Sequence, residues 1–363
     1  MMELQTKPDF ERCMKRVEAW FEGDLLDRPP VRFGAHNVQY NTISAEASRW
    51  PDLRARWFDA EYQVDRHLAG LAGHAFHGET FPLFWPNLGP DIYAAFFGGQ
   101  LEFGEVTSWS HPLIDDVENE AQTAALLFSE DNTYYRKLRE MTRIALDKCA
   151  GKSLVGVTSW CPSIDCVAAW RGPENLCMDL LTNPEAVKRL LDKSVAPFRK
   201  LAAEFHADLS AAGQPSVGWM GIPSLMQSHI PQADFSNMIS PAAFDEFCLP
   251  WLVREMDGIP RHIFHMDGKG VAMHLDRLLA RPEIQAIQWA QGVGHDLPIM
   301  QWIPLIQKIQ ASGKGVIVDL QLDELEPFLA AVRPERLYLC VTAPEAVQPA
   351  VLRRIEKWLT NRT

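Results

Sequence analysis

The feature that most constrains the fold is a regular alternation of apolar runs and helix-like segments in the second part of the chain. Six apolar runs have the length of buried strands, and segments with helical spacing of apolar residues separate them. The runs cover residues 153–160, 216–221, 261–267, 284–292, 314–321 and 336–344. Strands that alternate with helices in this way predict parallel βαβ units in one sheet.

The earlier part of the chain is expected to add helices and one more strand. Apolar residues at helical spacing predict a first helix over 8–22. A pair of prolines then breaks that helix before a short strand near 31–34. The remaining expected elements are a helix over 52–70, an aromatic loop over 76–98 and a helix over 130–149.

Together these elements predict an α/β fold, a single (β/α)₈ barrel. One domain is expected over 1–363, with extra N-terminal helices and loops over about 1–75 and the barrel in the remainder. A doubly wound open sheet is the alternative. No glycine-rich phosphate loop follows any expected strand, and this disfavours the nucleotide-binding version of that alternative.

Capping residues predict where two of the long helices begin. Asn183 and Ser240 are expected N-caps, and each is followed by a proline at the first helical position. The helices are expected over 184–209 and 240–258, with an interruption of the first at Pro197.

Composition limits the partners and the compartment. The net charge is −12, so nonspecific binding to nucleic acid or to an anionic membrane is not expected. No apolar run reaches the ~20 residues of a membrane-spanning helix, and the charged N-terminus lacks the apolar core of a signal peptide. The seven cysteines are an odd number without paired spacing, which is typical of reduced thiols. A soluble, cytoplasmic protein is therefore expected.

Polar and aromatic side chains gather where the expected strands end. Active residues of parallel barrels lie at the carboxyl ends of the strands, so these side chains are candidates for the site. In chain order they are Trp160, Trp219, His265, Asp267, Gln288, Trp289, Asp319 and Cys340. A tryptophan at a barrel rim can equally be a packing residue.

His265 and Asp267 are the candidate catalytic residues. Residues two apart in a strand point to the same side, so both are expected to project into the barrel mouth. An imidazole and a carboxylate are acceptable zinc ligands, and the Cys340 thiolate is a third candidate ligand. The alternative is a His–Asp hydrogen bond without metal, and the pair could also transfer protons.

The segment before the helix at 240–258 supplies one more candidate. Asp234 lies in a loop that could reach over the barrel mouth. His274 and Asp276 occupy the first turns of the helix after the 261–267 strand, where they are expected to face solvent rather than bind a ligand.

The residues around His265 also carry a family resemblance. Residues 232–270 contain an acidic-Phe-Ser segment, then "ISPAAFDEFCLP" and a His-x-x-Gly strand end. With "DRPPVRF" (27–33) and "DLLTNPEAVKRLLD" (179–192), this run resembles the uroporphyrinogen decarboxylase superfamily over most of the chain. The resemblance implies a (β/α)₈ barrel of that family, whose members include the decarboxylase and corrinoid-dependent methyltransferases.

Within that family the chain most resembles the corrinoid methyltransferase-like members. The similarity lies in "FWPNLGP" (84–90) and in the motif that begins at His265 and ends at Asp276. It implies that side chains of the first segment bind substrate alongside those at the strand ends. The expected substrate-binding residues are Trp85, Asn87, Trp160, Trp219, Asp234, Gln288, Trp289 and Asp319.

Two departures from the family patterns bear on the chemistry. The decarboxylase holds substrate carboxylates with an arginine-rich segment, whereas here Arg32 stands alone after the first strand. The methyltransferases hold zinc with His-x-Cys and a later strand-end cysteine. This chain has Asp267 in the first motif, and the later family position aligns nearer Ala343 than Cys340.

The resemblance implies transfer of a methyl group between a small methylated substrate and a corrinoid (cobalamin), supplied free or by a corrinoid protein as partner. Zinc is a candidate cofactor, and an oxygen ligand suits an oxygen leaving group, as in an ether. The tryptophans could surround an aromatic ether or a quaternary ammonium. The alternatives are a decarboxylase of a tetrapyrrole or smaller acid, and a non-catalytic corrinoid- or tetrapyrrole-binding barrel. Barrels of this family often form homodimers.

Overall fold

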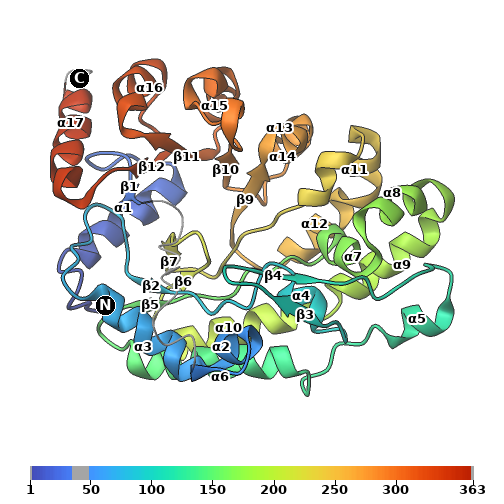
Figure 1. Ribbon diagram of the computed structural model, residues 1–363. Helices are drawn as coiled ribbons and strands as arrows, with labels where there is room; N and C mark the ends of the chain where they lie inside the picture. Colours follow the sequence, from blue (N-terminus) through green and yellow to red (C-terminus); the bar gives the residue numbers. More distant parts are fainter. Residues whose placement is uncertain (1, 35–48, 361–363) are drawn as a thin grey trace.

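The centre of the molecule is a curled sheet of six parallel strands, described here from a computed structural model of residues 2–34 and 49–360 (Figure 1). The strand order is β1-β12-β11-β10-β9-β8, so the first strand pairs with the last. The bounds are β1 (Val31–Phe33), β8 (Ser228–His229), β9 (Arg261–Asp267), β10 (Ala286–Ala290), β11 (Gly315–Gln321) and β12 (Leu337–Thr342). These strands confirm the expected parallel βαβ pattern for the last four apolar runs.

The other strands of the expected barrel are only two residues long. β2 (Leu83–Phe84) pairs in parallel with β5 (Leu154–Val155), and β6 (Ser216–Val217) pairs antiparallel with β7 (Pro223–Ser224). Backbone hydrogen bonds from residues beside these strands link them to their neighbours. Glu79 N, before β2, donates to Val31 O of β1 at 2.7 Å, and Val157 N, after β5, donates to Val217 O of β6 at 2.9 Å.

The prediction of eight regular strands in a closed barrel is therefore corrected to a curled six-stranded half-barrel with shorter strands beside it. Proline and glycine give the physical reason, because proline lacks the N–H of a ladder bond and glycine weakens a strand interior. Pro82 and Pro86 flank β2, Gly156 follows β5 and Gly218 follows β6.

Helices surround the strands and pack on their outer face (Figure 1). The expected helix over 184–209 is divided at Pro197 into α9 and α10, and the helix over 240–258 is divided near Cys248 into α11 and α12. The outer helices are α2 (Leu53–Phe58), α3 (Ala60–Leu71), α4 (Ile92–Ala95), α5 (Glu120–Ala125), α6 (Thr133–Lys148), α7 (Ile164–Arg171), α8 (Pro173–Thr182), α9 (Pro184–Val195), α10 (Phe198–Ala211), α11 (Pro241–Phe247), α12 (Leu249–Met256), α13 (Gly268–Val271), α14 (Leu275–Leu279), α15 (Ile303–Ala311), α16 (Leu325–Ala331) and α17 (Gln348–Thr360). A hairpin of β3 (Leu101–Phe103) and β4 (Ser108–Ser110) follows the aromatic loop, and the sequence did not predict it.

Two apolar clusters lie on the two faces of the curled sheet. Alternate residues of each strand point to opposite faces, so one set faces the helices and the other faces inward. The inward set includes Ile263, Ala286, Ile317 and Tyr338. Helix α1 (Phe10–Glu22) packs against this set and covers the end where the strands begin. A Cβ on Gly315 would meet the Trp20 ring at 2.8 Å, so this position requires a residue without a side chain.

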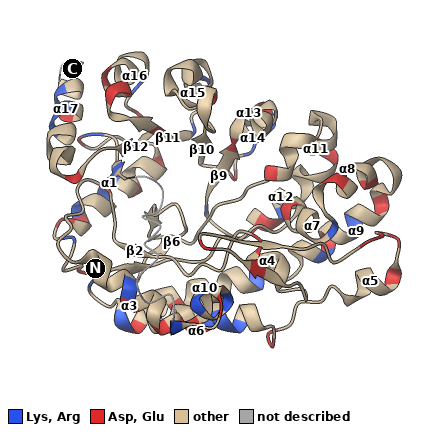
Figure 2. Ribbon diagram, in the orientation of Figure 1, with Lys and Arg blue, Asp and Glu red and all other residues tan. Residues whose placement is uncertain are grey.

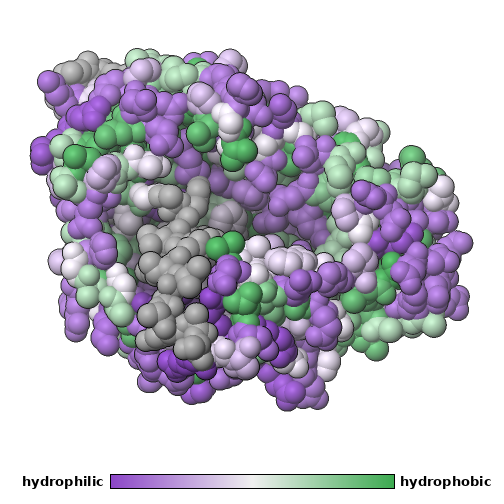
Figure 3. Space-filling view, viewed as in Figure 1, coloured by the Kyte–Doolittle hydropathy of each residue, from purple (hydrophilic) through white to green (hydrophobic). Residues whose placement is uncertain are grey.

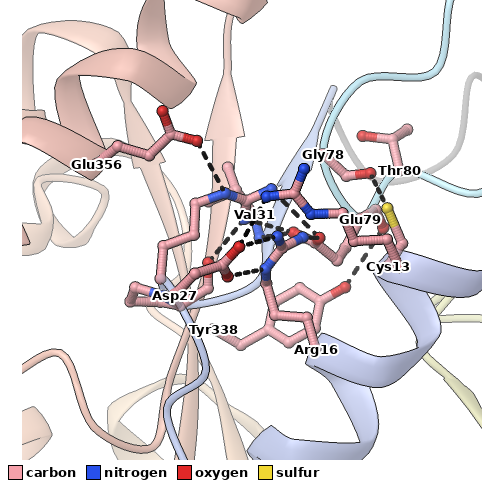
Figure 4. Close-up of polar contacts among 12 residues, drawn as sticks. Cys13, Arg16, Asp27, Val31, Gly78, Glu79, Thr80, Tyr338 and Glu356 are labelled. Carbon is pink, nitrogen blue, oxygen red and sulfur yellow. Dashed lines mark hydrogen bonds and ion pairs between the residues drawn. The ribbon is translucent and has the colours of Figure 1, made fainter. Parts of the chain in front are cut away.

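A buried ion network ties α1 to β1 (Figure 4). The Glu79 carboxylate is fully buried and accepts hydrogen bonds from Arg16, from Arg28 Nη1 at 2.7 Å and from Val31 N at 2.6 Å. Arg16 also binds Asp27 through Nε at 2.6 Å. Since a buried charge is costly unless it is paired and hydrogen-bonded, this network fixes how the helix seats on the sheet.

Within residues 2–34 and 49–360, no helix combines the length and the apolar character needed to cross a membrane.

Candidate functional site

Three side chains converge at the carboxyl end of β9. Ligand-type atoms of Asp234, His265 and Asp267 all lie within 4.8 Å of one another. His265 and Asp267 share the inward face of β9, as the two-residue spacing predicts. Asp234 opens the short 3₁₀ turn η2 (Asp234–Met238), so the loop that was expected to reach over the mouth meets the pair.

The chain before Asp234 runs alongside β9 and determines the position of Asp234 beside this strand. His265 N donates to Pro231 O at 2.9 Å, and Gln232 forms a parallel bridge with His265. Gln232 Nε2 then donates to the Asp234 carboxylate at 3.2 Å. These contacts place the carboxylate beside the imidazole.

The imidazole of His265 is oriented by two neighbours. Its Nδ1 hydrogen-bonds Gln288 Oε1, and Gln288 lies opposite His265 in the register of β9 and β10. An oxygen acceptor at this position requires a proton on Nδ1, which leaves the lone pair of the neutral ring on Nε2. The indole of Trp219 meets the ring edge-on, with centroids 5.1 Å apart. The ring is therefore held in the tautomer and orientation of a typical metal ligand.

Asp165 is a third carboxylate beside the group, and it comes from the first turn of α7. It accepts hydrogen bonds from Asp234 N at 3.0 Å and from Phe235 N at 2.9 Å, so it holds the start of η2 in place. The surrounding protein, and then the charge of Asp234, raise the pKa of Asp165. Burial and the charge of Asp267 likewise raise the pKa of Asp234. Carboxylates crowded in this way favour a bound proton or a cation.

A further carboxyl, that of Glu255, is fully buried and acts electrostatically on Asp165. Glu255 of α12 accepts a hydrogen bond from Ser163 Oγ, and its other carboxyl oxygen lies 3.2 Å from His229 Nε2. Burial raises the pKa of Glu255 to about 8 and lowers the pKa of His229 to about 3. Burial therefore favours the neutral form of both groups.

Cys340 does not join the group, so the predicted ligand set of His265, Asp267 and Cys340 is corrected. Within the described part of the chain, Asp234 takes the third place. Cys340 is buried on β12 and hydrogen-bonds Arg32 and Asp319, and burial raises the pKa of its thiol to about 12. Strands β10 and β11 separate β12 from β9, so at ~4.8 Å per strand the two lie about 14 Å apart along the sheet.

The four tryptophans expected to bind substrate do not all line one cavity; they are Trp85, Trp160, Trp219 and Trp289. Trp289 is wrong as a site residue, because it points to the outer face, is fully buried and packs against Trp302 with centroids 4.9 Å apart. Trp160 is buried among Tyr93, Phe198 and other rings, and also lines a small cavity beside Trp219.

Trp85 and Trp219 line the main cavity, which has a volume of about 300 Å³. Asn87 lines it too, and its Oδ1 accepts a hydrogen bond from Gly89 N at 2.8 Å. The face drawn in Figure 3 is hollowed near its centre, where hydrophilic residues gather. Because Trp219 touches both this cavity and His265, the cavity and the Asp234–His265–Asp267 group share a wall.

Sequence reasoning missed three charged residues at this site. Asp165 stands a few residues beyond the 153–160 run, and its proximity to a strand end could have marked it. Arg56 and Arg66 also line the main cavity, but they lie on helices α2 and α3. The rule that active residues lie at the carboxyl ends of strands does not select residues on helices.

Comparison with known proteins gives a likeness at the level of the fold. No family model matches the sequence, and no curated protein matches it. Among solved structures, a methyltransferase from Methanosarcina mazei superposes with a TM-score of 0.61 and 13% identity, over 96% of this chain and 99% of that chain. The two chains share a fold. The likeness runs almost end to end, so it includes both the half-barrel and the strands that bear the candidate site.

Proposed function

We propose that this protein is an enzyme that transfers a methyl group between a small methylated substrate and a corrinoid, carried by a partner protein or free. We further propose that its half-barrel belongs to a (β/α)₈ barrel of the uroporphyrinogen decarboxylase superfamily. The observation that carries the proposal is the meeting of Asp234, His265 and Asp267 next to an aromatic cavity. The fold shared with a methyltransferase supports it.

The three side chains fit a zinc ion as ligands. Zinc in proteins takes imidazole nitrogen and carboxylate oxygen, and a catalytic site has three protein ligands with one position open. A cation there would also offset the crowding that raises the pKa of Asp165 and Asp234. When bound, the metal would act as a Lewis acid on the leaving oxygen of a methyl ether.

The remaining residues have positioning roles in this proposal. Gln288 keeps the Nδ1 proton of His265 in place, and Asp165 holds the backbone that presents Asp234. Trp219 forms the wall between the cavity and the group, which keeps water from one side of the imidazole. The methyl group would pass as a cation equivalent to the reduced corrinoid, whose electron pair forms the new bond. The ether oxygen would keep the electron pair of the broken C–O bond and gain negative charge.

Metal analysis combined with a methyl-transfer assay tests the proposal. Protein purified without chelators is expected to hold about one zinc per chain and to methylate cob(I)alamin from a methyl ether. The His265→Ala variant should lose the zinc and the transfer. His111→Ala is the matched control, since His111 is exposed and pairs with Glu102 away from the group.

Each failure of the assay has its own meaning. Absence of both metal and transfer over a panel of methyl donors would refute the proposal. Release of carbon dioxide from a carboxylic acid would favour the decarboxylase. Tetrapyrrole absorbance of the purified protein, without turnover, would favour a non-catalytic corrinoid-binding barrel.

A further inference from the structure

The main cavity brings together cationic side chains that lie far apart in the sequence. Arg32 of β1, Arg56 of α2 and Arg66 of α3 all line it. Arg66 is the single lysine or arginine of α3, and Figure 2 marks basic residues in blue. Guanidinium groups stay protonated in proteins, so each adds a full positive charge. Three such groups around a cavity of about 300 Å³ make it a site for negative charge.

Two carboxylates offset part of this charge. Glu105 lines the cavity and pairs with Arg56 Nη1 at 2.8 Å. The negative charge of Asp319 acts directly on Arg32, and both side chains hydrogen-bond Cys340. Among the described residues named here, three positive charges therefore face two negative ones.

The remaining polar lining of the cavity is neutral. His67 hydrogen-bonds Ser153 Oγ at 2.8 Å, and burial lowers its pKa to about 4. The three arginines and two carboxylates named here thus carry a net charge of about +1.

The rest of the lining is apolar and largely aromatic. Rings approach from four directions, and their sources are β1, α2, β2 with its following loop, and the segment after β6. They include Phe33, Trp57, Phe84, Trp85 and Trp219, and Phe76 and Phe81 from the segment before β2 also line the cavity. The volume is at the small end of ligand pockets, which suits one substituted ring.

We propose that this cavity binds an aromatic carboxylate, with the ring between the indoles and the carboxylate at the arginines. The inference rests on the proposed function and names its substrate class, an aryl methyl ether that carries a carboxylate. It also decides between the two substrates suggested by the tryptophans. A quaternary ammonium would gain cation–π attraction but would be repelled by the net positive charge of these side chains.

Binding can be measured without corrinoid and without turnover. Trp57, Trp85 and Trp219 line the cavity, so a bound ligand should quench tryptophan fluorescence. The probes are 4-methoxybenzoate, neutral anisole and phenyltrimethylammonium, titrated at low salt. We expect 4-methoxybenzoate to bind at least about tenfold more tightly than either of the others, since a charge-assisted hydrogen bond is typically worth that much.

Variants of the arginines test the assignment of the anion site. Arg66→Gln should weaken 4-methoxybenzoate binding by about tenfold and leave anisole binding unchanged. Arg66→Lys keeps the charge and should recover part of the affinity, and it covers the case in which the glutamine variant is unstable. Arg136→Gln on the exposed face of α6 is the matched control and should have no effect.

The outcomes separate this inference from the proposed function. Equal affinity for the three probes, no binding of any, or an Arg66→Gln variant with unchanged affinity for the carboxylate would overturn the inference. Methyl transfer from neutral ethers with no preference for an acid would preserve the proposed function and overturn the inference. Selective carboxylate binding without any methyl transfer would do the reverse.

Discussion

Removal of the Glu79 charge is expected to destabilise the fold more than any surface ion pair can. Glu79 is 0% exposed, and the Arg16 and Arg28 side chains that it pairs are 4% and 5% exposed, so water cannot replace the carboxylate. Loss of one partner from a buried ion pair costs about 3–5 kcal/mol, because it leaves an uncompensated charge. Arg16 keeps Asp27, whereas the nearest other carboxylate to Arg28 is that of Glu356, 3.9 Å away.

We therefore expect Glu79→Gln to lower the free energy of unfolding by about 3 kcal/mol, near the low end of that range because the amide still accepts a hydrogen bond. Urea unfolding followed by circular dichroism gives the midpoint and the slope. Glu326→Gln is the matched control, since Glu326 and Arg354 are both largely exposed and such pairs are worth less than about 1 kcal/mol. If the two variants unfold at the same midpoint with the same slope, the network does not hold α1 on the sheet.

Three further predictions concern buried and positioning residues. The pKa of Glu255 is raised to about 8, so its contribution to stability is full below its unfolded pKa near 4.5 and is lost as the pH rises toward 8. The midpoint temperature of thermal unfolding should therefore fall more steeply from pH 5 to pH 8 for the wild type than for Glu255→Gln. Parallel profiles of the midpoint against pH would contradict this. Gln288→Ala should weaken zinc binding by about 10–100-fold in a competition titration, whereas Gln307→Ala on α15 should not; equal affinities would remove Gln288 from the site. Trp289→Ala should cost about 3–5 kcal/mol in urea unfolding yet leave 4-methoxybenzoate affinity unchanged, and a large loss of affinity would return Trp289 to the cavity.

Features that depend on the sequence of a single strand could be predicted. The runs at β9 to β12 are long and apolar because both faces of these strands are buried, so their place in a parallel sheet could be predicted. The pairing of His265 with Asp267 on one face followed from strand alternation alone. By contrast, the run over 153–160 gave only Leu154–Val155 as strand, and Gly156, the next residue, is of a type that weakens a strand interior.

The errors in the site arose where two elements had to be compared. Trp289 follows Gln288 directly, and a shift of one residue along a strand moves a side chain to the opposite face. Cys340 was placed with His265 because both end strands, but the sequence does not state how many strands lie between them. The Asp165 carboxylate accepts a hydrogen bond from the backbone N–H of Asp234, 69 positions away, and no local sequence pattern encodes this contact.

The pairing of β1 with β12 has a consequence for how the molecule is made on the ribosome. Translation proceeds at roughly 5–20 residues per second, so β1 emerges on the order of tens of seconds before its partner exists. Throughout that interval the hydrogen-bonding groups of β1 are an unpaired edge, which is prone to join other chains. Glu79 is synthesised soon after β1, and in the folded protein its carboxylate accepts a hydrogen bond from Val31 N. The Arg16–Glu79–Arg28 network can thus shelter the nascent strand until the last one arrives.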